Sequence, residues 1–350
     1  MSINEIRSNW ENQTANYDLD IHNWPEYWLN IAREKYSVIE SLETVHESLK
    51  PNQLVELGKH LQKATGSEEF IKRIDSYYES IVPQLLDEDE YMIQRFFTVR
   101  IVIPDQAKAG RLLQFHKDEW TGNGLGILTV WTPITHSDYI TNECYKNEWS
   151  FDKLQSESVT RSFPVELQPG QAHLFQQHHI HGNVNNDTPI SRWSMDGRIL
   201  PKGGEYHRKL PGGYFRFIGE RPDTRPIDPA KEYISYAGWN NSWSGGIPLP
   251  MQRATINEYC RNNNIKINDY QFENEFLDWY PALEQFITSY NVDAIVLCSI
   301  YSLPDDPFRR YTILKLAVDN NIELHFANEL CSIREEQDIK HIQRLLEYKI

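Results

Sequence analysis

A histidine and an aspartate lie one residue apart at the end of an apolar run, in the stretch LLQFHKDEWTGNG at residues 112–124. In a β-strand, residues i and i+2 point to the same face, so His116 and Asp118 would project together while Lys117 turns away. One imidazole beside one carboxylate forms either a hydrogen-bonded pair or two of the three ligands of a metal site. The motif alone does not decide between these two interpretations.

The segment QAHLFQQHHIHGN at residues 171–183 offers several candidates for a third ligand. They are His173, His178, His179 and His181. We expect His181 to be the ligand, because Gly182 follows it and removes side-chain bulk beside a metal. His179 is the alternative, since it shares a face with His181 in an unbroken strand. Two histidines and one carboxylate on one face form the facial triad of non-haem iron(II) oxygenases, which leaves coordination positions open.

A strand-like run further along the chain is polar on one face. Arg192, Ser194, Asp196 and Arg198 occupy alternate positions of the run RWSMDGR. Arginine is rarely buried without an anionic partner. Arg192 with Ser194 therefore predicts a receptor for a carboxylate, in which the guanidinium binds both oxygens and the hydroxyl adds one bond. We expect Arg198 either to hold a phosphate or carboxylate of a substrate or to pair with Asp196.

Residues 95–200 resemble the Fe(II)/2-oxoglutarate-dependent oxygenases of the phytanoyl-CoA dioxygenase-like branch. The family pattern is HxD, a distal His, an Arg about eleven residues beyond it, and an RxS element. These positions are occupied here by His116, Asp118, His181, Arg192 and Ser194. The resemblance implies a double-stranded β-helix (a cupin-like jelly roll) with N-terminal helices. It also implies Fe(II) as the metal, 2-oxoglutarate and O2 as cosubstrates, and hydroxylation rather than halogenation, since related halogenases lack the carboxylate ligand.

Two other interpretations of the motifs stand beside this one: an inert hydrogen-bonded pair, and a cupin-like metal enzyme that uses no oxo-acid. Arg192 distinguishes the cupin-like metal enzyme from an oxygenase, because an enzyme that uses no oxo-acid would not need a buried cation eleven residues after its last metal ligand. Trp120 either stacks on a sugar ring or another flat ligand, or packs in the mouth of the barrel. Arg100 and Thr129 lie on neighbouring strand-like runs and would contact the oxo-acid. The residues expected on the substrate side are Gln114, Trp120, Trp131 and Arg198.

The elements that must position these residues change type along the chain. Residues 1–92 show apolar positions at helical spacing and predict helices. Residues 93–222 consist of short strand-like runs separated by Gly, Pro and Asn, which predicts a β core and completes an oxygenase domain over 1–222. The proline-rich stretch 223–232 predicts a linker. Residues 233–350 alternate strand and helix, which predicts an α/β domain with a parallel sheet and makes the chain multidomain α+β.

Residues 233–330 resemble the small "sporadic carbohydrate cluster" proteins, which faintly resemble the catalytic domain of serine recombinases. The resemblance implies a flavodoxin-like α/β fold and a role in surface-carbohydrate biosynthesis. Recombinases carry the sequence YIRVS, whose serine attacks DNA, whereas this chain reads YISYA and places Ala237 at that position. We therefore expect a domain that does no chemistry. A further reason is that we expect no His–Asp or His–Glu cluster in this domain, with His325 and His341 isolated from any carboxylate.

The loop at residues 237–249 precedes a helix and is rich in Gly, Ser, Asn and Trp. In open α/β sheets, ligands bind beyond the carboxyl ends of the strands. The groups expected at this edge suit a glycan or a phosphorylated sugar, and they are Trp239, Trp243, Arg309 and Arg310. The alternative is an ordinary helix start, with Asp305 or Asp306 as the cap and Pro307 in the first turn.

Composition limits the partners. The formal net charge of −15 over 350 residues disfavours nucleic acid or an anionic membrane. The four cysteines form no CxxC pair, which favours a reducing cytoplasm. No stretch approaches the roughly 18 apolar residues of a membrane span. We predict a cytoplasmic enzyme acting on a sugar, nucleotide sugar or glycan precursor. The alternatives are a hydroxylase of an amino acid or small natural product, and a degenerate sensor or scaffold; a homo-oligomer is compatible with the sequence.

Overall fold

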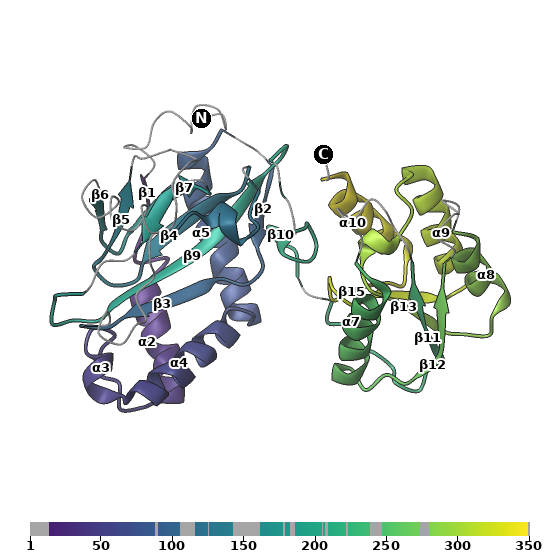
Figure 1. Cartoon of the computed structure of the whole chain (residues 1–350), viewed down its shortest axis with the longest axis horizontal. Helices are drawn as coiled ribbons and strands as arrows, with labels where there is room; N and C mark the ends of the chain where they lie inside the picture. Colours follow the sequence, from purple (N-terminus) through teal and green to yellow (C-terminus); the bar gives the residue numbers. More distant parts are fainter. Residues whose placement is uncertain are drawn as a thin grey trace. The chain divides into compact units, whose positions relative to one another are not determined.

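The chain divides into two units (Figure 1). The first comprises Met1–Leu210 and Tyr214–Glu220, and the second comprises Pro211–Gly213 and Arg221–Ile350. None of the described helices is long and apolar enough to cross a lipid bilayer. The computed structural model describes residues 14–87, 90–105, 116–124, 126–142, 162–177, 179–182, 186–204, 206, 209–221, 223–238, 247–273 and 280–348.

Helices make up most of the described N-terminal part of the first unit, as the sequence predicts. They are α2 (Trp24–Lys35), α3 (Val45–Ser48), α4 (Pro51–Ala64) and α5 (Glu68–Leu85). The side chain of Ser67 accepts a hydrogen bond from the backbone N–H of Phe70 at 3.2 Å, which satisfies one of the free N–H groups at the start of α5. The predicted helical segment also contains the strand β1 (Thr14–Asn16). A run of three residues is too short for hydrophobic periodicity to detect.

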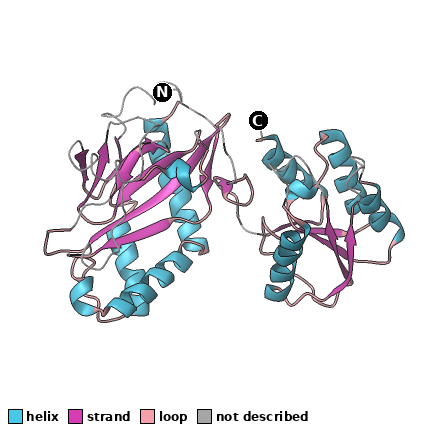
Figure 2. Cartoon of the chain, in the orientation of Figure 1, coloured by secondary structure: helices cyan, strands magenta, loops and turns pink. Residues whose placement is uncertain are grey.

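The strands of the first unit form two sheets whose strand pairs are antiparallel (Figure 2). The larger sheet has the order β1-β7-β4-β9-β2-β10, with β3 paired to β9, and the smaller has the order β6-β5-β8. The prediction of N-terminal helices followed by a β region is thereby confirmed, and the antiparallel pairing is what the structure adds. The strands are β2 (Tyr91–Gln94), β3 (Thr98–Val102), β4 (Leu128–Pro133), β5 (Ser137–Asn142), β6 (Ser162–Leu167), β7 (Gln171–Gln176), β8 (Ile180–Gly182), β9 (Arg192–Pro201) and β10 (Phe215–Phe217).

The two faces of β9 have different environments. One face joins the hydrophobic core formed by α5 and β4, through Trp193, Met195 and Ile199. On this face Gly197 lies so close to Phe97 that an added Cβ would be 2.0 Å from its ring, so a larger residue does not fit. The alternate residues of β9 therefore point to the other face of the sheet. These are the polar residues Arg192, Ser194, Asp196 and Arg198, all of them buried.

A buried ion pair joins α5 to β10, with Arg216 Nη2 lying 2.7 Å from Asp75 Oδ1. We expect the Arg216→Met variant to lose about 3–5 kcal/mol of unfolding free energy, because it leaves a buried carboxylate without its guanidinium. The matched control is Lys202→Met, which removes an exposed pair with Glu90 at 2.7 Å and is expected to cost about 1 kcal/mol or less. Urea unfolding of both variants measures the difference. If both variants lost the same unfolding free energy, burial would not be what makes the Arg216–Asp75 pair important.

The second unit contains a five-stranded sheet of order β12-β11-β13-β14-β15, in which only β15 runs antiparallel to its neighbour. Figure 1 shows α7 on one side of this sheet and α8 and α9 on the other. The predicted parallel sheet is present, and the antiparallel β15 is an addition. The elements are β11 (Tyr233–Ala237), α7 (Leu249–Asn262), β12 (Ile267–Phe272), α8 (Pro281–Ser289), β13 (Ala294–Leu297), α9 (Pro307–Asp319), β14 (Glu323–Phe326), β15 (Cys331–Ile333) and α10 (Glu336–Glu347).

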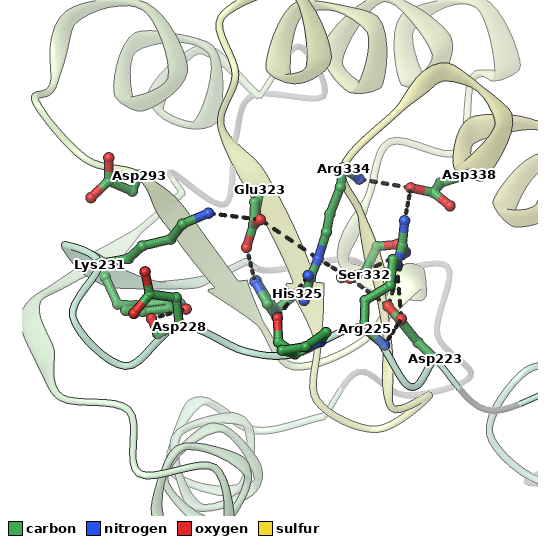
Figure 3. A network of polar contacts seen from close by, with 12 residues as sticks. Asp223, Arg225, Asp228, Lys231, Asp293, Glu323, His325, Ser332, Arg334 and Asp338 are labelled. Atoms are coloured by element: carbon green, nitrogen blue, oxygen red, sulfur yellow. Dashed lines mark hydrogen bonds and ion pairs between the residues drawn. The ribbon is translucent and has the colours of Figure 1, made fainter.

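The stretch 223–232, which the sequence predicts as a linker, is bonded to the second unit through a network of polar side chains (Figure 3). The guanidinium of Arg225 donates to Asp338 at 2.8 Å and to the carbonyl of Ser332 at 2.9 Å. Arg334 donates to the carbonyl of Pro226 at 2.9 Å. These bonds tie the stretch to β15 and α10, so it forms part of the packed second unit.

The prediction that His325 is isolated is wrong. Its Nε2 lies 3.0 Å from Glu323 Oε2, and its Nδ1 lies 2.9 Å from the hydroxyl of Tyr259 (Figure 3 shows the contact with Glu323). Glu323 and His325 are two residues apart on β14 and therefore share a face. Lys231 also donates to Glu323, at 2.8 Å. The second unit thus contains a buried His–Glu pair that the sequence motifs did not indicate.

We expect the free energy of unfolding to depend on pH through the carboxyl group of Glu323. Burial raises the pKa of Glu323, but hydrogen bonds from His325 and Lys231 lower it further, to about 2. Because this pKa is lower in the folded state, the carboxylate stabilises the fold above pH 4.5, and this contribution is lost as the pH falls toward 2. We expect Glu323→Gln to cost on the order of 2 kcal/mol at pH 7 and nothing near pH 2.

Thermal unfolding of the wild type and the Glu323→Gln variant between pH 7 and pH 2 measures this dependence. Glu336→Gln is a suitable control, because the side chain of Glu336 is 62% exposed. We expect the unfolding temperature of Glu336→Gln to equal that of the wild type at every pH in this range. A constant difference between Glu323→Gln and the wild type at every pH would show that packing and not charge is responsible.

Candidate metal centre

The backbone brings two distant histidines together. His116 and His181 form an antiparallel β-bridge, in which the N–H of His116 donates to the carbonyl of His181 at 2.9 Å and the N–H of His181 donates back at 3.0 Å. Residues paired directly in this way place their side chains on the same face. The two ring centroids are accordingly 4.4 Å apart. Strand β8, which contains His181, therefore defines the position of both imidazoles.

Asp118 reaches the same point from the first residue of a short 3-10 helix, η3 (Asp118–Thr121). Its Oδ1 lies 3.7 Å from Nε2 of His116 and 4.0 Å from Nε2 of His181. One ligand atom from each of the three residues lies within 4.8 Å of the others. Two imidazole nitrogens and one carboxylate oxygen around a common point are the donor set of a non-haem Fe(II) site, so the residues fit that metal.

The hydrogen bonds of His181 leave its metal-facing nitrogen free of a proton. Its Nδ1 lies 2.9 Å from the carbonyl oxygen of His179, which can only accept, so Nδ1 carries the hydrogen. Burial lowers the pKa of His181 to about 4, and the neutral imidazole is the form that binds a metal. His179 is oriented differently, because its Nδ1 accepts from the backbone N–H of Gln176 at 3.2 Å. The structure brings His181, and not the alternative His179, into the cluster with Asp118.

The second carboxylate oxygen of Asp118 is already bonded. Its Oδ2 accepts from Arg198 Nη2 at 3.1 Å and from the hydroxyl of Thr129 at 3.0 Å. The side-chain amide of Gln177 donates to the Thr129 hydroxyl oxygen at 2.8 Å. This bond leaves the hydroxyl hydrogen of Thr129 directed at Asp118. Burial raises the pKa of Asp118, but the neighbouring His116 and the Arg198 guanidinium hold it well below its usual range. Asp118 is therefore ionised, with one oxygen facing the histidines.

Arg198 is engaged by the protein itself. Besides Asp118 it donates to the side chains of Gln94 at 3.2 Å and Tyr214 at 3.3 Å. The predicted pair with Asp196 is present at 3.9 Å, but Asp196 is bonded more closely by Arg100 at 2.8 Å. Of the two residues expected to contact the oxo-acid, Thr129 therefore bonds to Asp118 and Arg100 to Asp196. The structure places Arg198 where it orients Asp118.

Arg192 and Ser194 lie on the same face of β9 as Arg198, and each is 7% exposed. Burial lowers the pKa of Arg192, which nevertheless remains a cation at any physiological pH. Trp131 is buried on β4 with Phe175, and 52% of Trp120 is exposed to solvent on η3. Gln114 and His178 lie outside the described residues. The structure thus assembles the predicted triad, and the predicted aromatic group Trp120, two residues along the chain from Asp118, is exposed to solvent.

Sequence reasoning missed part of the surroundings of Asp118. Asn123 donates to the backbone carbonyl of Asp118 at 2.8 Å, and Lys209 donates to the side-chain oxygen of Asn123 at 2.7 Å. Asn123 and Gln177 each lie close in sequence to a predicted ligand, and that proximity was the available signal. Lys209, Tyr214 and Gln94 lie far from the motifs along the chain and carry no local pattern that relates them to it.

At the expected ligand edge of the second unit, the ordinary helix start is confirmed. Asp306 caps α9 by accepting from the backbone N–H of Arg309, and Pro307 is the first helical residue. The side chain of Arg309 pairs with Glu284, and that of Arg310 is buried and donates to two carbonyls of the preceding loop. The two tryptophans expected there, Trp239 and Trp243, lie outside the described residues.

Comparison with known proteins gives one curated relative at significant similarity. It is the streptomycin biosynthesis protein StrG of Streptomyces griseus, 30% identical over 132 residues, which are 37% of this chain and 57% of StrG. The chain therefore spans little more than half the length of this relative. No family model matches the chain.

Among solved structures, the non-heme monooxygenase ThoJ in complex with Ni is 13% identical, with a TM-score of 0.37 over 59% of this chain and 78% of ThoJ. The non-heme alpha-ketoglutarate-dependent epimerase SnoN of nogalamycin biosynthesis is 14% identical, with a TM-score of 0.34 over 58% and 84%. The N-terminal catalytic domain of TP901-1 integrase is 13% identical, with a TM-score of 0.28 over 34% and 96%. TM-scores below 0.5 do not establish a common fold. The activities named for these proteins are therefore not assigned to this chain.

Proposed function

We propose that this chain is an Fe(II)- and 2-oxoglutarate-dependent oxygenase. The observation that carries the proposal is the convergence of one ring nitrogen of His116, one ring nitrogen of His181 and one carboxylate oxygen of Asp118 within 4.8 Å of one another. In this proposal the two antiparallel sheets are the halves of a double-stranded β-helix within residues 1–222. Residues 233–350 are then the predicted non-catalytic, flavodoxin-like domain, to which the stretch 223–232 is bonded.

With Fe(II), 2-oxoglutarate and O2, such a site inserts one oxygen atom into a substrate C–H bond and the other into succinate, with release of CO2. The chain's own residues prepare it in three ways. Arg198 and Thr129 hold Oδ2 of Asp118, which leaves Oδ1 to bind the metal. The carbonyl of His179 fixes the ring of His181. Arg192 and Ser194 would hold the far carboxylate of 2-oxoglutarate, the partner that a buried guanidinium suits best.

The substrate class that we favour is a sugar, a nucleotide sugar or a glycan precursor. The relative's printed name, streptomycin biosynthesis protein, supports a role in making a small product and equally fits a small natural-product precursor. Trp120, two residues along the chain from Asp118, is 52% exposed and would offer a flat apolar surface for a ring. The second domain would orient the substrate. Its parallel strand order β12-β11-β13-β14 supports the flavodoxin-like assignment.

Formation of succinate from 2-oxoglutarate by the purified full chain tests the proposal. We expect slow formation that requires Fe(II) and O2 in the absence of substrate, and faster formation when an extract containing the true substrate is added. Untargeted metabolite profiling with and without the protein would then identify the consumed compound. Failure of 2-oxoglutarate to bind the Mn(II)-loaded protein in calorimetry would overturn the proposal.

A further inference from the structure

Lys209 lies beside the metal centre without a carboxylate partner among the described residues. Its ammonium donates to the amide oxygen of Asn123 at 2.7 Å and lies 4.9 Å from the centroid of the Tyr214 ring. Asn123 in turn donates to the backbone carbonyl of Asp118 at 2.8 Å. The cation is therefore two hydrogen bonds away from a proposed metal ligand, and it faces a neutral amide and an aromatic ring.

The charges around this position leave a positive excess. The described charged side chains that bond to one another or to Asn123 beside the centre are the cations Arg100, Arg198 and Lys209 and the carboxylates Asp118 and Asp196. Three positive groups thus meet two negative ones. The double positive charge of Fe(II) and the double negative charge of ionised 2-oxoglutarate cancel, so binding of both would leave the excess of positive charge unchanged. The chain as a whole carries a formal charge of −15, so this local excess opposes the overall balance.

The ionisation of Lys209 responds to the same surroundings. Burial and the neighbouring Arg198 lower the pKa of Lys209 to about 8, against the smaller opposite effect of Asp118 and Asp196. A half-buried ammonium without an anion is unfavourable, and a bound anion would relieve this cost. Arg198 and Arg100 are already bonded to carboxylates, Arg198 to Asp118 and Arg100 to Asp196. Among the described residues, Lys209 is bonded to the neutral amide of Asn123 and to no carboxylate.

We propose that Lys209 recognises an oxyanion on the substrate, a phosphate or a carboxylate, and so restricts the enzyme to anionic substrates. This inference rests on the proposed function and sharpens its substrate class toward phosphorylated, nucleotide-linked or acidic sugars. An ammonium is a compact point charge that suits either oxyanion. Lys209 acts as a specificity residue here, distinct from Arg192, which binds the cosubstrate.

Titration calorimetry on the full chain, loaded with Mn(II) and saturating 2-oxoglutarate, tests the inference with glucose 1-phosphate, glucuronate and glucose. These probes share a ring and differ in charge, so they separate a phosphate from a carboxylate and both from the ring itself. We expect at least one anionic sugar to bind more tightly than glucose. We expect Lys209→Met to weaken that binding by about 10- to 100-fold, the value of a charge-assisted hydrogen bond, and Lys209→Arg to restore part of it.

The matched control is Lys202→Met, which removes an exposed lysine paired with Glu90 and should bind all probes like the wild type. Equal affinity of the wild type for the three sugars, or equal anion binding by wild type and Lys209→Met, would overturn the inference. So would a fall in 2-oxoglutarate affinity in Lys209→Met, which would assign the ammonium to the cosubstrate. Absence of 2-oxoglutarate binding in the wild type is a separate result, since it contradicts the proposed function itself.

Discussion

Replacing Asp118 by alanine is expected to abolish Fe(II)-dependent turnover and to weaken metal binding by more than about 100-fold. The variant removes the carboxylate oxygen that faces both Nε2 atoms of His116 and His181, at 3.7 and 4.0 Å. Loss of an outer hydrogen-bond partner of a metal ligand already costs about 10- to 100-fold in affinity, so loss of the ligand itself should cost more. Calorimetry with Mn(II) measures the binding, and succinate formation measures the turnover.

Two further variants separate loss of a ligand from loss of the fold. Asp118→Asn keeps oxygen and nitrogen atoms near Arg198 and Thr129 but removes the charge, so it should fold and still bind metal poorly. Glu119→Gln changes the neighbouring carboxylate, which pairs with Lys117 at 3.3 Å and should retain wild-type metal binding. Wild-type turnover by Asp118→Ala at limiting iron would exclude this residue as a ligand.

A pair of variants tests which histidine is the third metal ligand. We expect His181→Ala to lose metal and His179→Ala to keep it, because only the first imidazole directs a nitrogen at Asp118. The opposite result would shift the ligand to His179. The backbone carbonyl of His179, which orients His181, survives in the His179→Ala variant, so this comparison isolates the two rings.

The parts of the site that could be predicted from sequence are those determined by local geometry. The HxD spacing indicates that His116 and Asp118 lie close together, although the strand expected there ends after the bridge at His116 and Asp118 begins the 3-10 helix η3. The rule that residues i and i+2 of a strand share a face separates the polar and apolar faces of β9, and the structure shows Trp193 in the core and Arg198 on the opposite face. A glycine after His181 is the local signal that favours it over its neighbours.

Other parts depend on strand register, which no local pattern contains. The bridge between His116 and His181, and the position of Arg198 against Asp118, follow from which strands pair and in what alignment. Lys209 joins the site from a segment with no motif of its own. The pair of Glu323 and His325 is different, since it has the same i, i+2 spacing and could have been found by applying the rule to every strand.

Replacing Arg192 by methionine is expected to raise the 2-oxoglutarate concentration needed for half-saturation by roughly several hundred-fold. Arg192 is 7% exposed on the polar face of β9, where a carboxylate of the cosubstrate would be its partner. Truncating one member of a buried charge pair costs about 3–5 kcal/mol, and each 1.4 kcal/mol is a factor of about ten in affinity. Methionine keeps much of the apolar bulk, so metal binding through Asp118 and the histidines should persist.

Calorimetric titration of 2-oxoglutarate into the Mn(II)-loaded variant distinguishes this role from a structural one. Ser194→Ala removes a single neutral donor and should weaken binding by only about tenfold. Arg100→Met is the matched control: it removes a guanidinium on the neighbouring strand β3 that is bonded to Asp196 at 2.8 Å, so its effect on 2-oxoglutarate should be smaller than that of Arg192→Met. If Arg192→Met bound 2-oxoglutarate as the wild type does, the carboxylate receptor would have to lie elsewhere. Since Arg198 is held by Asp118, Lys209 would then be the next cation to test.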